Sequence, residues 1–278
     1  MRCCPQGFVG TWLADMTTVP ALRLDDVGAA SKLHEVYGVT RVGLGPWRMP
    51  FPGNWLFLKY VPPIKRWAPY RELSAADWES ILRVVERRAS TVTVAVTAAW
   101  VERDGTLVPY PKKFPAAARV LREGARRGVV EIANHGYTHC VLDSRRYLPR
   151  LFSGNRRYHR EFYAWVPEAT HREHLRRSQD ILENFFGMSV VTFVPPGNVF
   201  TRLTLEYAAS TGLRYLSCLG ADRLGPEAGL TPVPEADVVA IHDRDIVVRG
   251  IQWFEDLMRD KPVTTVHAVA QRLRASAG

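Results

Sequence analysis

Short apolar runs alternate with longer amphipathic segments along most of this chain, and this alternation constrains the fold more than any other feature of the sequence. The runs are rich in β-branched residues, as strands are, and they occupy residues 20–24, 90–98, 128–133, 189–194, 214–217 and 237–242. The segments between them have helical periodicity, and they occupy residues 74–88, 114–128, 167–187, 201–212 and 264–276. Strands that alternate with such helices form βα units, so we expect a mainly parallel sheet, open or closed into a barrel.

The predicted helices begin and end with residues that are typical of helix termini. Ser74 and Asp77 have the spacing of a capping box, and Pro115 lies near the start of the second helix. Gly128 and Gly187 follow the second and third helices, where a glycine commonly ends a helix. These signals support helices between the strands.

Two long stretches interrupt the alternation. Residues 41–73 are rich in Pro, Trp and Lys/Arg, and residues 142–167 are rich in Arg, Tyr and Phe. Connections this long in a compact domain are usually functional, and each follows a predicted strand, where the loops of βα folds build the active face. We expect both stretches to be lids or walls of a binding site; a loop that covers the core is the alternative for 41–73.

The chain has 278 residues and no internal repeats, which is consistent with one large domain. No apolar run reaches the roughly 18 residues of a membrane-spanning helix, and the N-terminal residues lack the pattern of a signal peptide. We therefore expect no membrane partner and a cytoplasmic location. The cysteines lack zinc-knuckle spacing, which favours free thiols in a reducing compartment; they are Cys3, Cys4, Cys140 and Cys218.

The formal net charge of +9 favours acidic partners. A small molecule that bears phosphate or a nucleotide is one candidate; nucleic acid is a weaker one, because the sequence contains no recognised nucleic-acid motif. Arginine pairs are also common on solvated helix faces. Because His171 and His174 lie among the arginines of the helix 167–187, we expect both at the surface.

Chemically active side chains follow four of the predicted strands. The first strand ends in "RLDDV", where Asp25 and Asp26 would repel each other without a cation nearby. The third runs into "HGYTH", which places His135 and His139 four residues apart at a strand's C-terminal end, where α/β folds bind ligands. Taken alone, the acids also suit a turn or a cap, and the histidines also suit a structural role.

The other two strand ends carry Gly197 and His242. Gly197 follows two prolines, and a turn of this kind is either a plain rigid turn or one that aims a backbone N–H at a reacting oxygen. A lone histidine such as His242 is more often structural. Taken together, two histidines and a carboxylate are the ligand set of a catalytic metal with open positions. A further Asp and a further His then suit a general base and a general acid.

In order and content, these motifs resemble the polysaccharide deacetylase superfamily, of the carbohydrate esterase family 4 type, over roughly residues 20–245. "HGYTH" corresponds to that family's H-x-x-x-H motif and "FVPPGN" to its F-R-P-P-Y-G motif, while "RLDDV" and "REF" look closest to a divergent branch. The resemblance implies an α/β fold: a distorted (β/α) barrel of about seven strands with long loop insertions, forming one metal-dependent catalytic domain over residues 1–278.

The resemblance also implies roles for the site residues. A divalent metal, most commonly Zn²⁺ with Co²⁺, Ni²⁺, Mn²⁺ and Fe²⁺ as alternatives, would be bound by Asp26, His135 and His139. Asp25 would be the general base for the attacking water, and His242 would protonate the departing amine. The N–H of Gly197 would share the developing oxyanion with the metal.

The chain departs from the family pattern at two positions. Val194 stands where the family has the arginine that orients the catalytic aspartate, and Gly197 stands where it has a tyrosine. Arg23 and Arg244 are two candidates to replace the missing arginine.

The implied activity is removal of an N-acetyl group from an amino sugar or a glycosylated small molecule. A deformylase or another C–N amide hydrolase of the same fold, and a non-catalytic metal-containing sugar-binding protein, are the alternatives. Because the chain lacks the pattern of a secretion signal, we expect an oligosaccharide or small-molecule substrate rather than a cell-wall polymer. A phosphate or nucleotide on that substrate would suit the basic, aromatic insertions.

Overall fold

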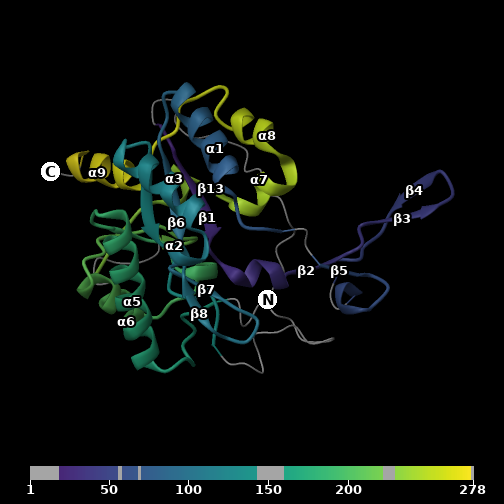
Figure 1. Ribbon diagram of the computed structural model, residues 1–278, viewed down its shortest axis with the longest axis horizontal. Coiled ribbons are helices and arrows are strands. Elements are labelled where there is room, and N and C mark those ends of the chain that lie inside the picture. The colour runs from purple at the N-terminus through teal and green to yellow at the C-terminus, as the bar shows by residue number, and fades with distance from the viewer. Residues whose placement is uncertain (1–18, 56–57, 68–69, 143–159, 222–228, 277–278) are drawn as a thin grey trace.

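A curled parallel sheet forms the centre of the molecule (Figure 1). The computed structural model describes residues 19–55, 58–67, 70–142, 160–221 and 229–276. Among these residues seven strands pair in parallel, in the order β12-β11-β10-β9-β6-β1-β13. Their bounds are β1 Ala21–Val27, β6 Val92–Val96, β9 Val130–Asn134, β10 Thr192–Phe193, β11 Tyr215–Leu216, β12 Thr231–Pro232 and β13 Val238–His242.

One side chain shows how strongly the sheet curls. Arg23 of β1 donates from Nη1 to the backbone oxygen of Ser217, 2.8 Å away, and Ser217 directly follows β11. Three strands separate β1 from β11 in the sheet order, so a flat sheet would hold them too far apart for one side chain to bridge. The sheet is therefore a half-barrel, which confirms the predicted distorted (β/α) barrel of about seven strands.

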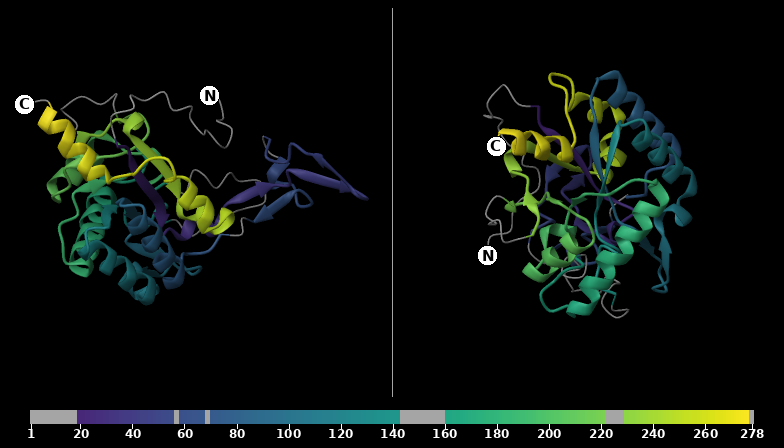
Figure 2. Two further views of the ribbon diagram at one scale, coloured as in Figure 1. Left: turned by 90° about the horizontal axis from the view of Figure 1, so that it is seen from above. Right: turned by 90° about the vertical axis from the view of Figure 1, so that its left-hand side faces the viewer.

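Helices cover the outer face of this half-barrel (Figures 1 and 2). Their bounds are α1 Ala75–Arg87, α2 Tyr110–Lys113, α3 Pro115–Arg126, α5 Glu168–Phe186, α6 Arg202–Ser210, α7 Asp243–Arg249, α8 Ile251–Asp256 and α9 Val266–Ser276. The buried face of α1, including Trp78 and Ile81, packs in the same core cluster as Val94 of β6 and Leu121 of α3. Each fully buried side chain of this size contributes about 1.5–3 kcal/mol relative to an exposed one.

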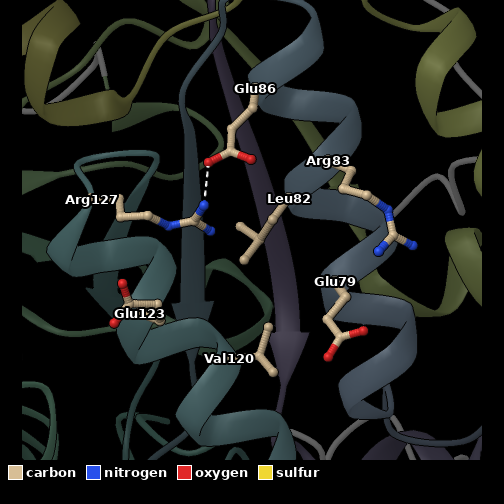
Figure 3. A pocket seen from close by; sticks show the side chains of 7 residues that line it. All are labelled: Glu79, Leu82, Arg83, Glu86, Val120, Glu123 and Arg127. Atoms are coloured by element: carbon tan, nitrogen blue, oxygen red, sulfur yellow. Dashed lines mark hydrogen bonds and ion pairs between the residues drawn. The ribbon is translucent and has the colours of Figure 1, made fainter.

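The sequence signals at the helix ends are confirmed. The Ser74 hydroxyl accepts from the Asp77 N–H, and the Ser74 N–H donates to the Asp77 carboxylate, which completes the capping box. Pro115 is the first residue of α3, and Gly187 ends α5 with a φ of 70°. A hollow on the outer surface between α1 and α3 is spanned by the ion pair of Glu86 and Arg127 (Figure 3).

Each of the six strands expected from the sequence overlaps an observed strand. The sequence analysis missed β12, because two residues leave too little apolar pattern to detect, and it missed α7 and α8 after β13. It also missed the antiparallel hairpin of β7 (Ala99–Val101) and β8 (Leu107–Pro109). Short 3-10 turns at η1 (Ala30–His34), η4 (Pro196–Asn198) and η7 (Glu235–Asp237) complete the half-barrel.

The first long insertion is an extension that projects away from the half-barrel (Figures 1 and 2). It begins earlier than the predicted residue 41, because β2 already belongs to it. We call residues 36–67 the arm. It contains the antiparallel pairs β2–β5 and β3–β4 and the short turn η2, with bounds β2 Val36–Gly38, β3 Arg41–Leu44, β4 Trp47–Pro50, η2 Leu58–Tyr60 and β5 Lys65–Trp67.

Much of the second insertion, residues 143–159, lies outside the described residues, as do Cys3 and Cys4. The other two cysteines, Cys140 and Cys218, are buried and form no disulfide within the described residues. Within the described part of the chain, no helix has the length and apolarity needed to cross a bilayer.

Candidate metal and catalytic site

The end of β1 presents two neighbouring carboxylates. In a regular strand, Asp25 and Asp26 would point to opposite faces of the sheet. Here the register of β1 with β6 shifts between Leu24 and Val27, and Asp26 has a φ of 69° in the left-handed region. A bulge of this kind redirects a side chain. The local backbone therefore takes Asp26 out of the strand's alternation, at the end of the sheet where the histidine motif also lies.

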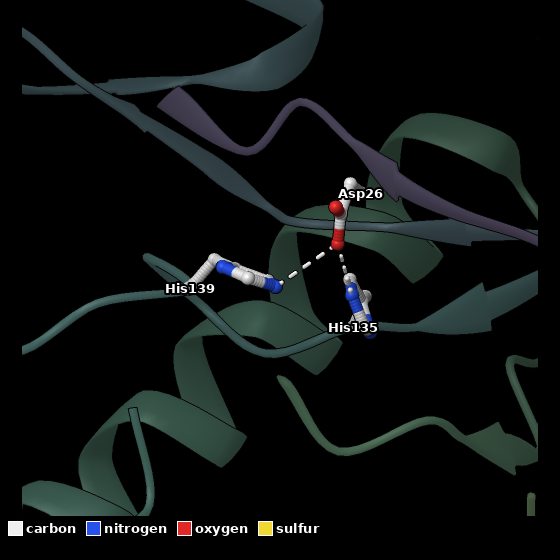
Figure 4. Close-up of side chains that lie close together, drawn as sticks. All are labelled: Asp26, His135 and His139. Atoms are coloured by element: carbon white, nitrogen blue, oxygen red, sulfur yellow. Dashed lines mark hydrogen bonds and ion pairs between the residues drawn. The ribbon is translucent and has the colours of Figure 1, made fainter. Parts of the chain in front are cut away.

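Asp26 meets both histidines of "HGYTH" (Figure 4). Its Oδ1 lies 3.3 Å from His135 Nε2 and 3.1 Å from His139 Nε2, and all three side chains are buried. Their three ligand atoms lie within 4.8 Å of one another. The structure thus brings together the three residues that the sequence analysis assigned to a metal.

The hydrogen bonds of the two imidazoles leave the inward nitrogens available for a metal. His135 Nδ1 lies 2.6 Å from the Val194 carbonyl oxygen, which can only accept, so the proton belongs on Nδ1 and the lone pair on Nε2. His139 Nδ1 lies 2.9 Å from Ser31 Oγ, while its buried Nε2 has no hydrogen-bond partner. A buried, unsatisfied nitrogen beside a carboxylate and a second imidazole fits a divalent cation.

Asp26 is held in its charged form. Burial alone would raise its pKa, but the Arg244 guanidinium, His242 and His139 together hold the pKa of Asp26 well below its usual range. Arg244 Nη1 donates to Asp26 Oδ2 at 2.7 Å and to Glu35 Oε1 at 2.5 Å. An ionised carboxylate is the form that binds a metal.

Arg23 supports the other carboxylate, Asp25. Its Nε and Nη2 donate to the two Asp25 carboxylate oxygens, each at 2.8 Å, in the bidentate geometry that fixes a carboxylate most firmly. Ser217 holds the opposite side of the guanidinium through its backbone oxygen and its hydroxyl. Of the two candidates to replace the arginine missing at Val194, Arg23 contacts Asp25, and Arg244 contacts Asp26.

His242 lies beside Asp25 at the end of the neighbouring strand. The two residues are paired in the parallel register of β1 and β13, and the His242 side chain is 38% exposed. Burial acts to lower its pKa, but the charge of Asp26 and the hydrogen-bonding contact with Asp245 outweigh this and raise the pKa of His242. His242 Nδ1 lies 3.6 Å from Asp245 Oδ2, within the first turn of α7.

The sequence profile of the polysaccharide deacetylase family matches residues 70–216. The chain belongs to this family. The matched region contains His135, His139 and Gly197, whereas the acidic pair and His242 lie outside it and are brought to the same site by the half-barrel. Family membership supports amide hydrolysis of the deacetylase type in general.

Solved structures of deacetylase type resemble the chain only distantly. A carbohydrate esterase family 4 pseudoenzyme from Bacillus anthracis has 13% identity and a TM-score of 0.44, over 71% of this chain and 62% of that chain. A peptidoglycan N-acetylglucosamine deacetylase has 15% identity and a TM-score of 0.44, over 70% and 81%. The corresponding domain of a multidomain xylanase from the hindgut metagenome of Trinervitermes trinervoides has 14% and 0.44, over 73% and 86%. No curated protein matches the sequence.

A residue that the sequence analysis did not single out, Glu161, holds the loop that carries His135 and His139. The carboxylate of Glu161 is buried and accepts hydrogen bonds from the backbone N–H groups of Tyr137, Thr138 and His139, at 3.0–3.1 Å. A Cβ on Gly136 would lie 2.3 Å from the same carboxylate, so this position has room only for glycine. The signal in the sequence was "REF", where Glu161 is the only acid among several arginines.

The prediction that His171 and His174 lie at the surface is wrong. Both are buried on the inner face of α5, in a series of buried residues at three- and four-residue steps that continues through Leu175, Ser178 and Leu182. His174 Nδ1 lies 2.5 Å from Glu161 Oε1, and although burial acts to raise the pKa of Glu161, this contact lowers it. His171 bonds the Thr204 hydroxyl and the Tyr163 carbonyl. Their spacing relative to the buried residues of the helix predicts their burial better than the neighbouring arginines do.

The buried side chain of Lys32 holds the backbone of Asp26. Lys32 of η1 donates to the Asp26 backbone oxygen at 3.1 Å, and it also pairs with Glu72 at 2.6 Å and with Asp243. Burial acts to lower the pKa of Lys32, but the two carboxylates raise it, so the amine stays charged. Glu72 in turn accepts the N–H of Gly28 at 3.1 Å. This network fixes the backbone within the bulge, at Asp26, and directly after it, at Gly28.

The two departures from the family pattern have local explanations. Val194 packs against Ala95 and Ala133 in a small apolar cluster and contributes its backbone carbonyl to His135. Gly197 has a φ of 59°, and a Cβ there would lie 2.7 Å from the Arg160 side chain. Arg160 thus takes the space that a side chain at position 197 would need. The oxyanion role of the Gly197 N–H stays a prediction.

Proposed function

We propose that this chain is a metal-dependent amide hydrolase that removes an N-acetyl group from an amino sugar or a glycosylated small molecule. One observation carries the proposal: the Asp26–His135–His139 cluster lies next to Asp25, a carboxylate clamped by Arg23. A structural metal site needs no second, separately oriented carboxylate beside its ligands, whereas a hydrolytic site needs a general base.

The three ligand residues suit a catalytic ion. Asp26, His135 and His139 would hold it with two nitrogens and one oxygen, a donor set that Zn²⁺ accepts with positions left for water and substrate; Co²⁺, Ni²⁺, Mn²⁺ and Fe²⁺ are alternatives. When bound, the ion supplies Lewis acidity that activates water and polarises the amide carbonyl.

Asp25 is the proposed general base. It takes a proton from the attacking water as the water oxygen forms a bond to the acyl carbon. Arg23 occupies one side of the carboxylate with two hydrogen bonds and so fixes the direction in which the remaining lone pairs point. The Gly197 N–H would stabilise the oxyanion that develops on the carbonyl oxygen.

His242 is the proposed general acid. The pKa of His242 is raised, so its imidazole stays protonated up to a higher pH than that of an ordinary histidine. It donates this proton to the amide nitrogen as the C–N bond breaks, so that acetate and a free amine leave. Because His242 pairs in register with Asp25, the base and the acid lie on adjacent strand ends.

The substrate is proposed from charge and from the acyl group. With a net charge of +9, the protein favours a sugar that bears phosphate or another acidic group. The same residues would also hydrolyse a formamido sugar, and comparison of formate release with acetate release separates the two activities.

The test combines metal content with product release. Wild type, His135→Ala, Asp25→Asn and the control His267→Ala, whose histidine lies away from the site near Tyr215, are compared for bound metal and for acetate released from N-acetylglucosamine oligomers and their phosphorylated forms. We expect His135→Ala to lose metal and activity, and Asp25→Asn to keep metal but lose turnover. Full activity in Asp25→Asn would overturn the catalytic proposal, and an unchanged metal content in His135→Ala would overturn the ligand assignment.

A further inference from the structure

The arm carries large apolar side chains that the described part of the molecule leaves exposed. Trp47 is 75% exposed, Trp55 66%, Met49 55% and Val42 41%. Scattered exposed apolar residues are normal on a protein surface, but a group of them on one projecting element marks an interaction site.

Three of these side chains share one face of the β3–β4 hairpin. Val42 lies opposite Met49 in the antiparallel register, and Trp47 lies two residues from Met49 on the same strand. Cross-strand partners and alternate residues of a strand point to the same side. An isolated two-stranded hairpin is marginally stable at best in water, so an apolar face on it gains most from a partner that covers it.

The charge of the arm indicates what that partner is. The arm contains no Asp or Glu, and its cationic residues are Arg41, Arg48, Lys59, Lys65 and Arg66. A second copy of the chain, docked arm to arm, would bring two segments of the same net positive charge together, which costs electrostatic energy. The complementary partner is therefore an anionic surface with an apolar layer beneath it.

We propose that the arm docks on a membrane surface that contains anionic phospholipids. Trp is enriched at the membrane–water interface, where Trp47 and Trp55 would lie among the headgroups with Val42 and Met49 beside the acyl chains. Lys and Arg near the surface attract the anionic headgroups. The sequence analysis expected no membrane partner because it tested for a spanning helix, and a hairpin of this kind leaves no such signal.

Nucleic acid fits the same charge but not the same apolar face. Single strands stack their bases on aromatic side chains, whereas two of the three exposed side chains on this face, Val42 and Met49, are not aromatic. The backbones at Gly38 and Gly53 pack closely within the arm: a Cβ on Gly38 would lie 1.8 Å from the Gly53 carbonyl oxygen, so only glycine fits there. The Gly38 N–H also donates to Asn54 Oδ1 at 2.7 Å.

The test uses the full chain and vesicles. Co-sedimentation is measured with phosphatidylcholine vesicles and with vesicles of equal parts phosphatidylcholine and phosphatidylglycerol, at low and high salt. We expect binding to the anionic vesicles only, weakened by salt. The double variant Trp47→Thr, Met49→Thr places β-branched residues, which suit a strand, at both positions. We expect it to bind the anionic vesicles at least about tenfold more weakly than wild type.

Two further variants make the result decisive. Arg41→Glu, Arg66→Glu keeps the apolar face and should also lose binding, whereas Val248→Ser, Leu273→Ser removes exposed apolar residues elsewhere and should bind like wild type. Equal binding by wild type and both arm variants would overturn the proposal. So would absence of binding to anionic vesicles, tighter binding to a single-stranded oligonucleotide, or self-association that the arm variants abolish.

Discussion

The histidine loop at the metal site and the β3–β4 hairpin of the arm are both short excursions from the half-barrel, but they are held in opposite ways. His135 and His139 are buried, each has a fixed partner on Nδ1, and Glu161 binds the backbone between them. Trp47 and Met49 are exposed on a two-stranded hairpin. The candidate metal site is held in place by the protein itself, whereas the apolar face of the arm, on our proposal, is covered only when a partner binds.

The largest effect is expected where the support of the loop is removed. In Glu161→Ala, three backbone N–H groups and His174 lose their buried acceptor, so we expect unfolding to become easier by about 3–5 kcal/mol, as for other broken buried pairs. Metal binding should weaken as well, because His139 is no longer held. Urea denaturation and metal titration measure the two effects.

A matched control for this change lies on α5. Glu173 is exposed and pairs with Arg176 and Arg177, so Glu173→Ala should change stability by no more than about 0.5 kcal/mol. If Glu161→Ala unfolds at the same urea concentration as Glu173→Ala, the loop is held by something other than this carboxylate.

The second effect concerns Arg23 and turnover. Arg23→Met removes both hydrogen bonds to Asp25, and we expect kcat to fall by about 10- to 100-fold, as for other supporting partners of a reactive group. Arg23→Lys offers a compact point charge but not the two parallel N–H donors of arginine. We therefore expect its kcat to lie between those of wild type and Arg23→Met. Metal content should stay at the wild-type level in both, since Arg23 contacts no proposed ligand side chain.

Thermal unfolding of both Arg23 variants separates a folding defect from a positioning defect. The exposed Arg176→Met is the control and should keep wild-type turnover. A kcat of Arg23→Met close to that of wild type would show that Asp25 needs no clamp, and it would weaken the assignment of Asp25 as the base.

Most of the half-barrel was predictable from the sequence because its signals are local. Strands such as 90–98 and helix ends such as Ser74 and Gly187 report their structure within a few residues. The clustering of the three proposed ligands was predictable for a related reason: parallel strands in a half-barrel bring their C-terminal ends to one side, where Asp26 lies close to His135 and His139.

The rest depended on contacts that no local pattern contains. Glu161 bonds backbone N–H groups, which carry no side-chain signature, and the choice of Arg23 over Arg244 for Asp25 depends on the curl that brings Ser217 to β1. The bulge that redirects Asp26 depends on Lys32 and its buried carboxylates, far apart in sequence. Residues 41–73 were expected to be a lid or wall of a binding site, or a loop that covers the core, because composition shows that a segment is unusual but not where it points.

A smaller effect is expected in the pH dependence of activity. His242 must be protonated to act as the acid, so its raised pKa places the alkaline fall of kcat at higher pH than for an ordinary histidine. Asp245 is one cause of this shift, and Asp245→Asn should therefore move the alkaline fall to lower pH while the plateau stays near wild type. An alkaline limb that is identical in wild type and Asp245→Asn would show that another group controls it.

The smallest expected effect tests the difference between the buried histidine loop and the exposed β3–β4 hairpin. If the arm's apolar face is completed only by a partner, the double variant Trp47→Thr, Met49→Thr should change the unfolding free energy of the isolated protein by no more than about 0.5 kcal/mol, because its side chains are exposed. Acetate release from a soluble oligosaccharide should also be unchanged, since the arm projects away from the half-barrel (Figure 2). A large loss of stability in solution would mean that these side chains pack within the protein, and the arm would then be part of the fold in the same sense as the histidine loop.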